Sequence, residues 1–535
     1  MENTLDYYDI QGNILINYAE FGHIKSRYLF LEVITGDGGR EFIREIQKFI
    51  TTIPNPYKEI NLGNATTNIG FTYAGLKMLG LPVLSLHEFP EEFTIGMRGR
   101  ATILGDDGTS APEHWDAVYK QTIHIFISID AKNVVDLDKR YKAIVDSINK
   151  FTPGIKLLDN HKNQDGEEVA AYQEAAALNN EKGYPTAKEH FGYTDGISNP
   201  FFKGMTEEMG SVLGGGKKST IKENGYGDPK VESTWEPIAT GEFILGYADE
   251  AQEYPKAPKP PLLAKNGSFM VFGKFHENVG AFNNYLNEVG ALFPGGKEAL
   301  AAKFVGRWRN GAPLATFPTQ EEGDKAAAER ERTIFAMATA TSPEAYKQAR
   351  ADFNKINKDF IAFDYEKDIA GSRCPIGAHT RRANPRGSLE FGRKGAFNSP
   401  SSLDDRRRII RRGLPYGTST PESNTREHGT IIMSIVASIS RQFEFVFQQW
   451  MNYGNDFKLG NDGDPIIGNH PSIGGTEENP IYGGKMIVQG SKKENQDPYF
   501  LSKIPRFVET RGGEYFFLPS LTALRMIGEG LVDPT

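Results

Sequence analysis

The chain has 535 residues, or about three to four domain-equivalents at roughly 150 residues each. Its 61 basic and 69 acidic side chains leave a net charge of −8, which argues against a nucleic-acid-binding surface, because such surfaces are normally basic. Hydrophobic residues make up 39% of the chain and charged residues 24%, as in folded rather than disordered proteins. The one cysteine, Cys374, excludes an intrachain disulfide, an iron–sulfur cluster and a cysteine-rich zinc site.

The N-terminal residues show no targeting segment. Residues 1–6 lack a basic region followed by an apolar run, and no stretch approaches the roughly 18 consecutive apolar residues of a membrane-spanning helix. We therefore expect a cytoplasmic protein that binds neither a membrane nor a nucleic acid. Secretion by another route and the oligomeric state stay open.

The first half of the chain alternates strands and helices. Apolar runs predict strands at 27–34, 67–72 and 122–129, and apolar residues spaced three and four apart predict helices near 40–50 and 134–149. Strand–helix–strand followed by strand–helix is the order of a ferredoxin-like unit, whose antiparallel sheet carries helices on one face.

The second half repeats this order around a long insertion. Strands are predicted at 268–275 and near 430–438, and helices near 279–289 and 440–451. The charged, alanine-rich part of the insertion, 321–353, is predicted as surface helix.

A loop-rich connection joins the two halves. It contains a Gly-Gly-Gly-Lys-Lys segment at 214–218 and a proline-rich run at 255–261, both of which are loop signals. The sequence therefore predicts an α+β fold of two ferredoxin-like units with antiparallel sheets and surrounding helices. We place an N-terminal domain at 1–200, the connection at 201–265 and a C-terminal domain at 266–535.

Three segments carry side chains with a chemical use. The first places Asp195 between Gly192 and Gly196, and glycines permit tight turns and the close approach of a bulky group. On its own, this segment is more typical of a simple turn aspartate.

The second segment, 374–386, places His379 among small residues, where an imidazole can reach a large planar cofactor without obstruction. Imidazole is a common axial ligand of haem iron. Three nearby arginines could bind carboxylates such as haem propionates: Arg381, Arg382 and Arg386. The alternatives are a histidine at a helix end or in the core, and Cys374 as a thiolate ligand.

The third segment, 407–417, is a cluster of arginines that ends in a turn signal. Such a cluster is usually a solvated surface. The turn at its end nevertheless allows at least one guanidinium to point inward.

In this order, the three segments resemble those of the dye-decolorizing peroxidase family. The Gly-x-x-Asp-Gly motif of that family appears at 192–196, its proximal-histidine motif at 378–386 and its distal-arginine motif at 410–417. Further similar segments are spread over nearly the whole chain: 9–15, 241–247, 306–308 and 442–445.

The resemblance implies a haem peroxidase with one haem b (heme b) per chain, which reduces hydrogen peroxide with electrons from bulky phenolic or dye-like donors. It implies His379 as the iron ligand and Asp195 as the acid–base that moves the peroxide proton. It implies Arg411 as the cation that stabilises developing negative charge.

The resemblance also implies residues that hold the cofactor. Arg386 and Gly196 would contact the haem. Asp464 would accept a hydrogen bond from the second nitrogen of the proximal histidine, with Asp462 and Glu444 as alternatives.

The chain departs from the family pattern at two places. Gly273 stands where relatives commonly have arginine, which puts one polar or propionate contact in question. The segment 429–433 lacks the leucine and phenylalanine that relatives commonly show, which leaves the shape of the peroxide pocket open. Two other interpretations also stay open: a haem-binding or iron-handling protein with incidental peroxidase activity, and a ferredoxin-like interaction protein without a cofactor.

Overall fold

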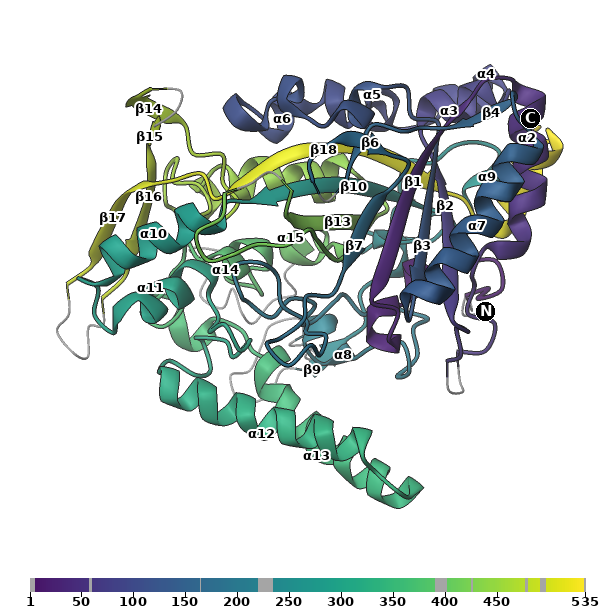
Figure 1. Cartoon of the computed structure of the whole chain (residues 1–535). Helices are drawn as coiled ribbons and strands as arrows, with labels where there is room; N and C mark the ends of the chain where they lie inside the picture. The colour runs from purple at the N-terminus through teal and green to yellow at the C-terminus, as the bar shows by residue number, and fades with distance from the viewer. Residues whose placement is uncertain are drawn as a thin grey trace.

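The computed structural model describes residues 5–56, 60–163, 165–219, 234–389, 402–424, 427–476, 480–490 and 497–533. Over these residues the chain is α+β, with helices packed around one large sheet whose paired strands are antiparallel (Figure 1). The fold class predicted from the sequence is confirmed, whereas the domain boundaries stay a prediction.

The N-terminal half contributes the strands that the sequence predicts. β1 (Lys25–Val33) pairs with β3 (Ile125–Ala131), and β3 pairs with β2 (Ala65–Phe71). The short strands β4 (Ile155–Leu157) and β7 (Gln173–Ala176) pair with β1. Almost every residue of β1, β2 and β3 is buried, which explains the apolar runs at the centres of β1 and β3.

Helices α2 (Gly36–Ile46) and α7 (Val134–Lys150) follow β1 and β3. α2 begins after Thr35, whose hydroxyl accepts a hydrogen bond from the backbone N–H of Gly38. The helix predicted near 40–50 therefore begins earlier and ends earlier than expected, because this cap fixes its start.

The C-terminal half is built on three long strands. β10 (Ser268–Glu277) pairs on one side with β13 (Gly429–Val436) and on the other with β18 (Val508–Leu518). β11 (Ile410–Arg412) and β12 (Pro415–Tyr416) both pair with β13. β18 was not predicted from the sequence.

The two halves share one ten-stranded sheet. They join where Phe517 on β18 pairs with Phe71 on β2. Phe30 on β1 and Phe272 on β10 are separated by several strands in the sheet order, yet their ring centroids lie only 5.3 Å apart. The sheet therefore curls on itself, and the apolar faces of both halves fill one core.

The insertion forms two helices, α12 (Gln320–Ala338) and α13 (Pro343–Ile361), which pack against each other and project from the body (Figure 1). The helix predicted near 440–451 is a run of π-type turns, η9 (Ser440–Glu444) and η10 (Val446–Met451). The helix predicted near 279–289 is α10 (Val279–Gly290).

The remaining helices and strands complete the layers around the sheet. The α-helices are α1 (Gly12–Leu15), α3 (Tyr73–Met78), α4 (Val83–His87), α5 (Glu91–Gly99), α6 (Ala101–Leu104), α8 (Val212–Gly215), α9 (Pro261–Ala264), α11 (Gly296–Val305), α14 (His379–Ala383), α15 (Ser402–Asp405) and α16 (Leu521–Glu529). The strands are β5 (His161–Lys162), β6 (Glu168–Ala170), β8 (Lys217–Ser219), β9 (Thr234–Glu236), β14 (Ser472–Gly475), β15 (Pro480–Tyr482), β16 (Gly484–Val488) and β17 (Tyr499–Ile504).

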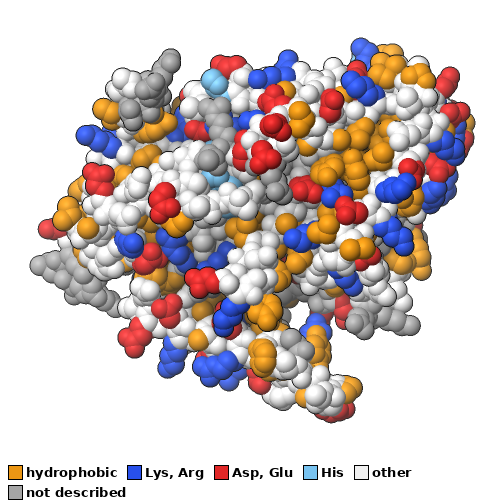
Figure 2. All heavy atoms as spheres, viewed as in Figure 1, with side chains coloured by type: hydrophobic (Ala, Val, Ile, Leu, Met, Phe, Trp, Pro, Cys, Tyr) orange, Lys and Arg blue, Asp and Glu red, His pale blue; other side chains and the backbone are white. Residues whose placement is uncertain are grey.

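The visible face of the molecule carries acidic and basic side chains interspersed with apolar ones (Figure 2). This mixture agrees with the small net charge of the chain. Among the helices that the structure describes, none is long and apolar enough to cross a membrane.

Candidate active site

A cavity of about 310 Å³ lies between helix α14 and the strands β10, β11 and β13. Apolar side chains from β10, β13, η10 and the adjoining loops form much of its wall. They include Phe275, Ile409, Ile432, Val446, Phe447 and Ile466.

His379 is the first residue of α14 and lines this cavity. Its Nδ1 atom lies 3.0 Å from Oδ2 of Asp464, which is completely buried. The other oxygen of Asp464 accepts hydrogen bonds from the backbone N–H groups of Ile466 and Ile467, at 2.8 and 3.0 Å. Burial alone would raise the pKa of Asp464, yet His379 and these hydrogen bonds hold it below its ordinary value.

The structure thus brings Asp464, rather than Asp462 or Glu444, next to His379. Glu444 is paired with Arg100, at 2.6 Å. His379 keeps its Nε2 atom available to the cavity.

Arg382, one turn further along α14, fixes this short helix. Its guanidinium is buried and donates hydrogen bonds to four backbone carbonyls: Gly377 at 3.1 Å, Trp450 at 2.8 Å, Tyr453 at 3.0 Å and Asp462 at 2.7 Å. These bonds tie the helix that carries His379 to η10 and to the loop that carries Asp464. Arg381 likewise donates to the backbone carbonyls of Asp368, Ile369 and Cys374. Both arginines therefore point into the protein rather than into the cavity.

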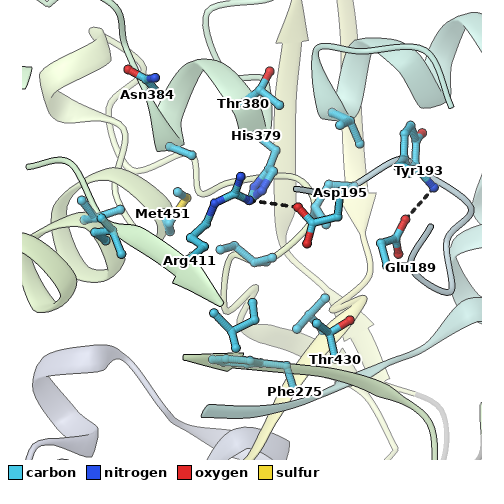
Figure 3. A pocket seen from close by; sticks show the side chains of 18 of the residues that line it. Glu189, Tyr193, Asp195, Phe275, His379, Thr380, Asn384, Arg411, Thr430 and Met451 are labelled. Atoms are coloured by element: carbon cyan, nitrogen blue, oxygen red, sulfur yellow. Dashed lines mark hydrogen bonds and ion pairs between the residues drawn. The ribbon is translucent and has the colours of Figure 1, made fainter. Parts of the chain in front are cut away.

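Asp195 and Arg411 point into the same cavity as His379 (Figure 3). Nη1 of Arg411 lies 3.0 Å from Oδ1 of Asp195. Arg411 belongs to β11, and its backbone N–H donates to the side chain of Asn199, at 3.1 Å. The strand and the loop that carries Asp195 are thereby fixed to each other.

Gly196 supports this arrangement through its backbone. Its N–H donates to Oδ1 of Asp195, at 2.6 Å, and its φ of +75° is a conformation that favours glycine. A Cβ atom at this position would meet nothing within 4 Å, so the requirement for glycine is conformational rather than steric.

Three further arginines line the cavity, of which the sequence assigned a role only to Arg386. Arg386 donates to the carbonyls of Ile361 and Phe363, each at 2.8 Å. Arg307 and Arg408 are buried. Burial lowers the pKa of Arg307 to about 9 and that of Arg408 to about 10.

None of these three arginines forms an ion pair with a carboxylate in the part of the chain that the structure describes. Their side chains bond to backbone carbonyls instead, Arg307 to Gly311 and Phe360 and Arg408 to Gly215 and Gly216. The cavity wall therefore presents three guanidinium groups without a carboxylate ion pair among the described residues, which suits a ligand with carboxylate groups.

These features fit haem. Over the described residues, no group of three or more His, Cys, Asp or Glu side chains is arranged to hold a metal ion. A single imidazole in an apolar cavity suits haem iron, because the porphyrin supplies most of the other ligands. The arginines that form no ion pair with a carboxylate among the described residues suit the haem propionates. Cys374 is buried in a neighbouring apolar cluster and does not line the cavity.

The two departures from the family pattern have different consequences. A Cβ atom on Gly273 would lie 2.5 Å from the ring of Phe275, which lines the cavity, so this aromatic ring occupies the space of a longer side chain. On β13, Thr430 and Ile432 line the cavity, whereas Met433 belongs to the core on the other face. Only the first two can shape the pocket.

Two glutamates at the cavity wall, Glu189 and Glu277, were not found from the sequence. They lie far apart along the chain, and no motif joins them. The segment that contains Glu189 directly precedes Asp195, which was the only available signal.

Comparisons with known proteins find similar chains. A family model described as the DyP dimeric alpha+beta barrel domain matches residues 9–162. A dye-decolorizing peroxidase of Mycena epipterygia is 28% identical over 547 aligned positions, which cover 98% of this chain and 88% of that protein. A multifunctional dye peroxidase of an Amycolatopsis species is 26% identical, and the alignment covers 97% of this chain and 95% of that protein.

Solved structures give the same result. An ancestral D-type dye-decolorizing peroxidase superposes with a TM-score of 0.67 at 26% identity, covering 98% of this chain and 99% of its own. A dye-decolorizing peroxidase in complex with 2,6-dimethoxyphenol shares the fold, with a TM-score of 0.67 at 24% identity and coverage of 98% and 100%.

Proposed function

Since the chain belongs to the dye-decolorizing peroxidase family and is a peroxidase, we propose that its cavity binds one haem b, held by His379. The observation that carries this proposal is the placement of an Asp464–His379 pair and an Asp195–Arg411 pair at one apolar cavity. When bound, haem supplies the iron at which hydrogen peroxide is cleaved and the oxidising equivalents that are passed to donors.

On the proximal side, Nε2 of His379 would be the iron ligand. Asp464 fixes the imidazole orientation and keeps the proton on Nδ1, which leaves the lone pair of Nε2 free. The anionic partner also makes the imidazole a stronger donor.

On the distal side, Asp195 would accept the proton that hydrogen peroxide loses and return it to the departing oxygen. Arg411 would hold a fixed positive charge next to the negative charge that develops on that oxygen. Their 3.0 Å contact keeps the two side chains together before peroxide arrives.

Arg307, Arg386 and Arg408 would bind the two propionates. Gly196 would serve the site by shaping the turn that presents Asp195. Electron donors of the phenolic or dye-like class follow from the relatives, one of which binds 2,6-dimethoxyphenol. The cytoplasmic location expected from the sequence stays a prediction.

Variants of the histidine test cofactor binding. His379→Ala should lose most of its haem on gel filtration, while His87→Ala, which changes an exposed histidine on α4, should keep it. Normal haem content and an unchanged absorbance spectrum in His379→Ala would contradict the proposed ligand.

Stopped-flow mixing with peroxide tests the distal pair. Arg411→Leu and Asp195→Asn should each slow the first spectral change by roughly 10²–10³-fold. We expect Arg411→Leu to have at least as large an effect, because water can replace a proton carrier but not a fixed cation. Parental rates in both variants would mean that the distal acid–base and cation are other residues.

A further inference from the structure

A pair of acidic side chains lies at the same cavity as Asp195 but has no part in the mechanism above. Glu189 begins the loop that leads to Asp195, and Glu277 ends strand β10. Both line the cavity, and their carboxyl groups lie within hydrogen-bonding reach of each other. Figure 3 shows Glu189 near Asp195, with Thr430 on β13 below it.

The surrounding donors hold both carboxyl groups in place. Glu189 accepts hydrogen bonds from the backbone N–H groups of Phe191 and Tyr193, each at 2.7 Å. Glu277 accepts from the backbone N–H of His190, at 3.1 Å, and from the hydroxyl of Thr430, at 2.5 Å. The loop that leads to Asp195 is therefore fastened to β10 and β13 through this pair.

Two carboxyl groups in contact at a water-poor site cannot both be ionised, so that such a pair holds one proton between them. Burial, together with the charge of Glu277, raises the pKa of Glu189 well above its ordinary value, and burial also raises the pKa of Glu277. The pair therefore keeps its shared proton to a higher pH than an isolated carboxyl group would.

The neighbouring charged groups do not neutralise the pair. Arg309 is bonded to Glu298, at 2.8 Å, and to the carbonyl of Phe191. The His190 ring is engaged by Ser419 and the Tyr416 carbonyl. The other titratable groups that face the pair are Asp195, Tyr193, Tyr416 and His428. Among the described residues, neither glutamate forms an ion pair with a cation.

We propose that Glu189 and Glu277 form a one-proton carboxyl pair that supplies protons to Asp195 during turnover. The pair acts through Asp195 and does not itself contact peroxide. This inference rests on the proposed peroxidase site, because it assigns a source to the protons that this site consumes.

The proton balance shows why such a source is needed. Reduction of hydrogen peroxide to two waters consumes two electrons and two protons. A phenol that is oxidised inside the cavity releases a proton there with each electron. A donor that delivers only electrons brings none, and both protons must then come from water or from acidic groups at the cavity.

Glu277→Gln separates a proton-supplying role from a structural one. The amide oxygen can still accept from His190, and the amide nitrogen can donate to Glu189 and to the Thr430 hydroxyl, which rotates to accept. The variant thus keeps the hydrogen bonds of Glu277 but has no proton to release. Asp106→Asn is the matched control, since it removes a different buried carboxyl at the same cavity.

The first measurement is infrared spectroscopy of the haem-loaded protein at neutral pH. We expect a carboxylic-acid C=O band that disappears in Glu277→Gln, because the substituted amide removes the neighbouring charge and donates a hydrogen bond that stabilises ionised Glu189. This band should persist in Asp106→Asn, which loses only the separate contribution of Asp106. Persistence of the same band in Glu277→Gln would show that the pair does not hold the proton.

The second measurement is turnover with two donors, ferrocyanide, which carries no proton, and 2,6-dimethoxyphenol, which releases one per electron. Glu277→Gln should slow ferrocyanide turnover by at least about tenfold, less than the roughly 10²–10⁴-fold of a direct acid–base group, because water carries part of the proton flow. Phenol turnover and the first reaction with peroxide should change much less. In the parent, ferrocyanide turnover should fall at alkaline pH, where the carboxyl pair loses its proton. This alkaline decline should be absent in the variant.

Equal ferrocyanide turnover and equal pH profiles in parent and variant would overturn the proton supply while leaving the peroxidase site intact. A parent that binds haem but does not react with peroxide would instead overturn the proposed function. If Glu277→Gln fails to retain haem, Glu189→Gln, which leaves Glu277 in place, is measured in the same way and decides between the two roles.

Discussion

Replacing Asp464 by asparagine tests the proximal side of the site with almost no change in side-chain size. In the parent, Oδ1 accepts from the N–H groups of Ile466 and Ile467, and Oδ2 faces Nδ1 of His379 at 3.0 Å. The two backbone donors require an oxygen on their side. The amide nitrogen of the substituted side chain would therefore face Nδ1 of His379, where a donor already stands.

The substitution thus removes a negative charge and a hydrogen bond at once. Loss of a carboxylate that orients a metal-bound histidine typically weakens metal binding by about 10–100-fold, or about 1.4–2.7 kcal/mol. The ferric state loses more binding free energy than the ferrous state, because the more highly charged iron is stabilised more by an electron-rich ligand. At about 59 mV per tenfold change for one electron, the reduction potential should rise by about 60–120 mV.

The assay is spectroelectrochemical titration of the haem-loaded Asp464→Asn protein, with haem affinity measured in parallel. Asp462→Asn is the matched control, because it removes the same charge from a neighbouring residue whose backbone carbonyl, not its side chain, bonds to Arg382. An unchanged potential in Asp464→Asn, or an equal rise in both variants, would refute the reasoning.

Three further substitutions test the supports of the site. Arg382→Ala removes the donor from four backbone carbonyls, of which those of Gly377 and Trp450 are buried, and at about 1–3 kcal/mol for each buried carbonyl the free energy of unfolding should fall by at least about 2 kcal/mol in urea denaturation. Gly413→Ala places a Cβ atom 1.9 Å from the Ile431 carbonyl at a φ of +136°, so we expect a loss of at least about 3 kcal/mol and a slower peroxide reaction through β11; a parental Tm would contradict this. Burial raises the pKa of Asp106 to about 7, so the folded protein binds a proton that the unfolded chain releases, and stability falls as pH rises from about 4 to about 7. Asp106→Asn should remove this decline, a gain of at most about 4 kcal/mol above pH 7, measured by urea unfolding at pH 5 and pH 8.

The sequence predicts strands well where burial produces an apolar run, as in β1 and β3. It misses β18 because Val508–Leu518 contains two glycines and three charged residues. In the folded chain these charges have partners within reach: Arg511 pairs with Glu509, and Glu514 accepts from the backbone N–H of Met97. Hydropathy patterns therefore fail to detect a buried strand whose charged residues find their partners only in the folded protein.

The site shows the same limit. Asp195, His379 and Arg411 lie in short motifs, so their chemistry is visible in the sequence. The burial of Arg307 and Arg408 cannot be predicted from the sequence, because a buried and an exposed arginine are indistinguishable there. Likewise, the Glu189–Glu277 pair exists only because β10 ends beside the loop that leads to Asp195.

Cys374 gains a different importance in a protein that consumes an oxidant. Peroxide attacks the thiolate form of cysteine. Burial raises the pKa of Cys374 to about 11, so only about one molecule in 10⁴ carries a thiolate at pH 7. The only sulfhydryl of the chain is thus held close to the site of peroxide turnover in a form that resists sulfenic acid formation. Loss of activity during prolonged exposure to peroxide should therefore proceed without thiol oxidation.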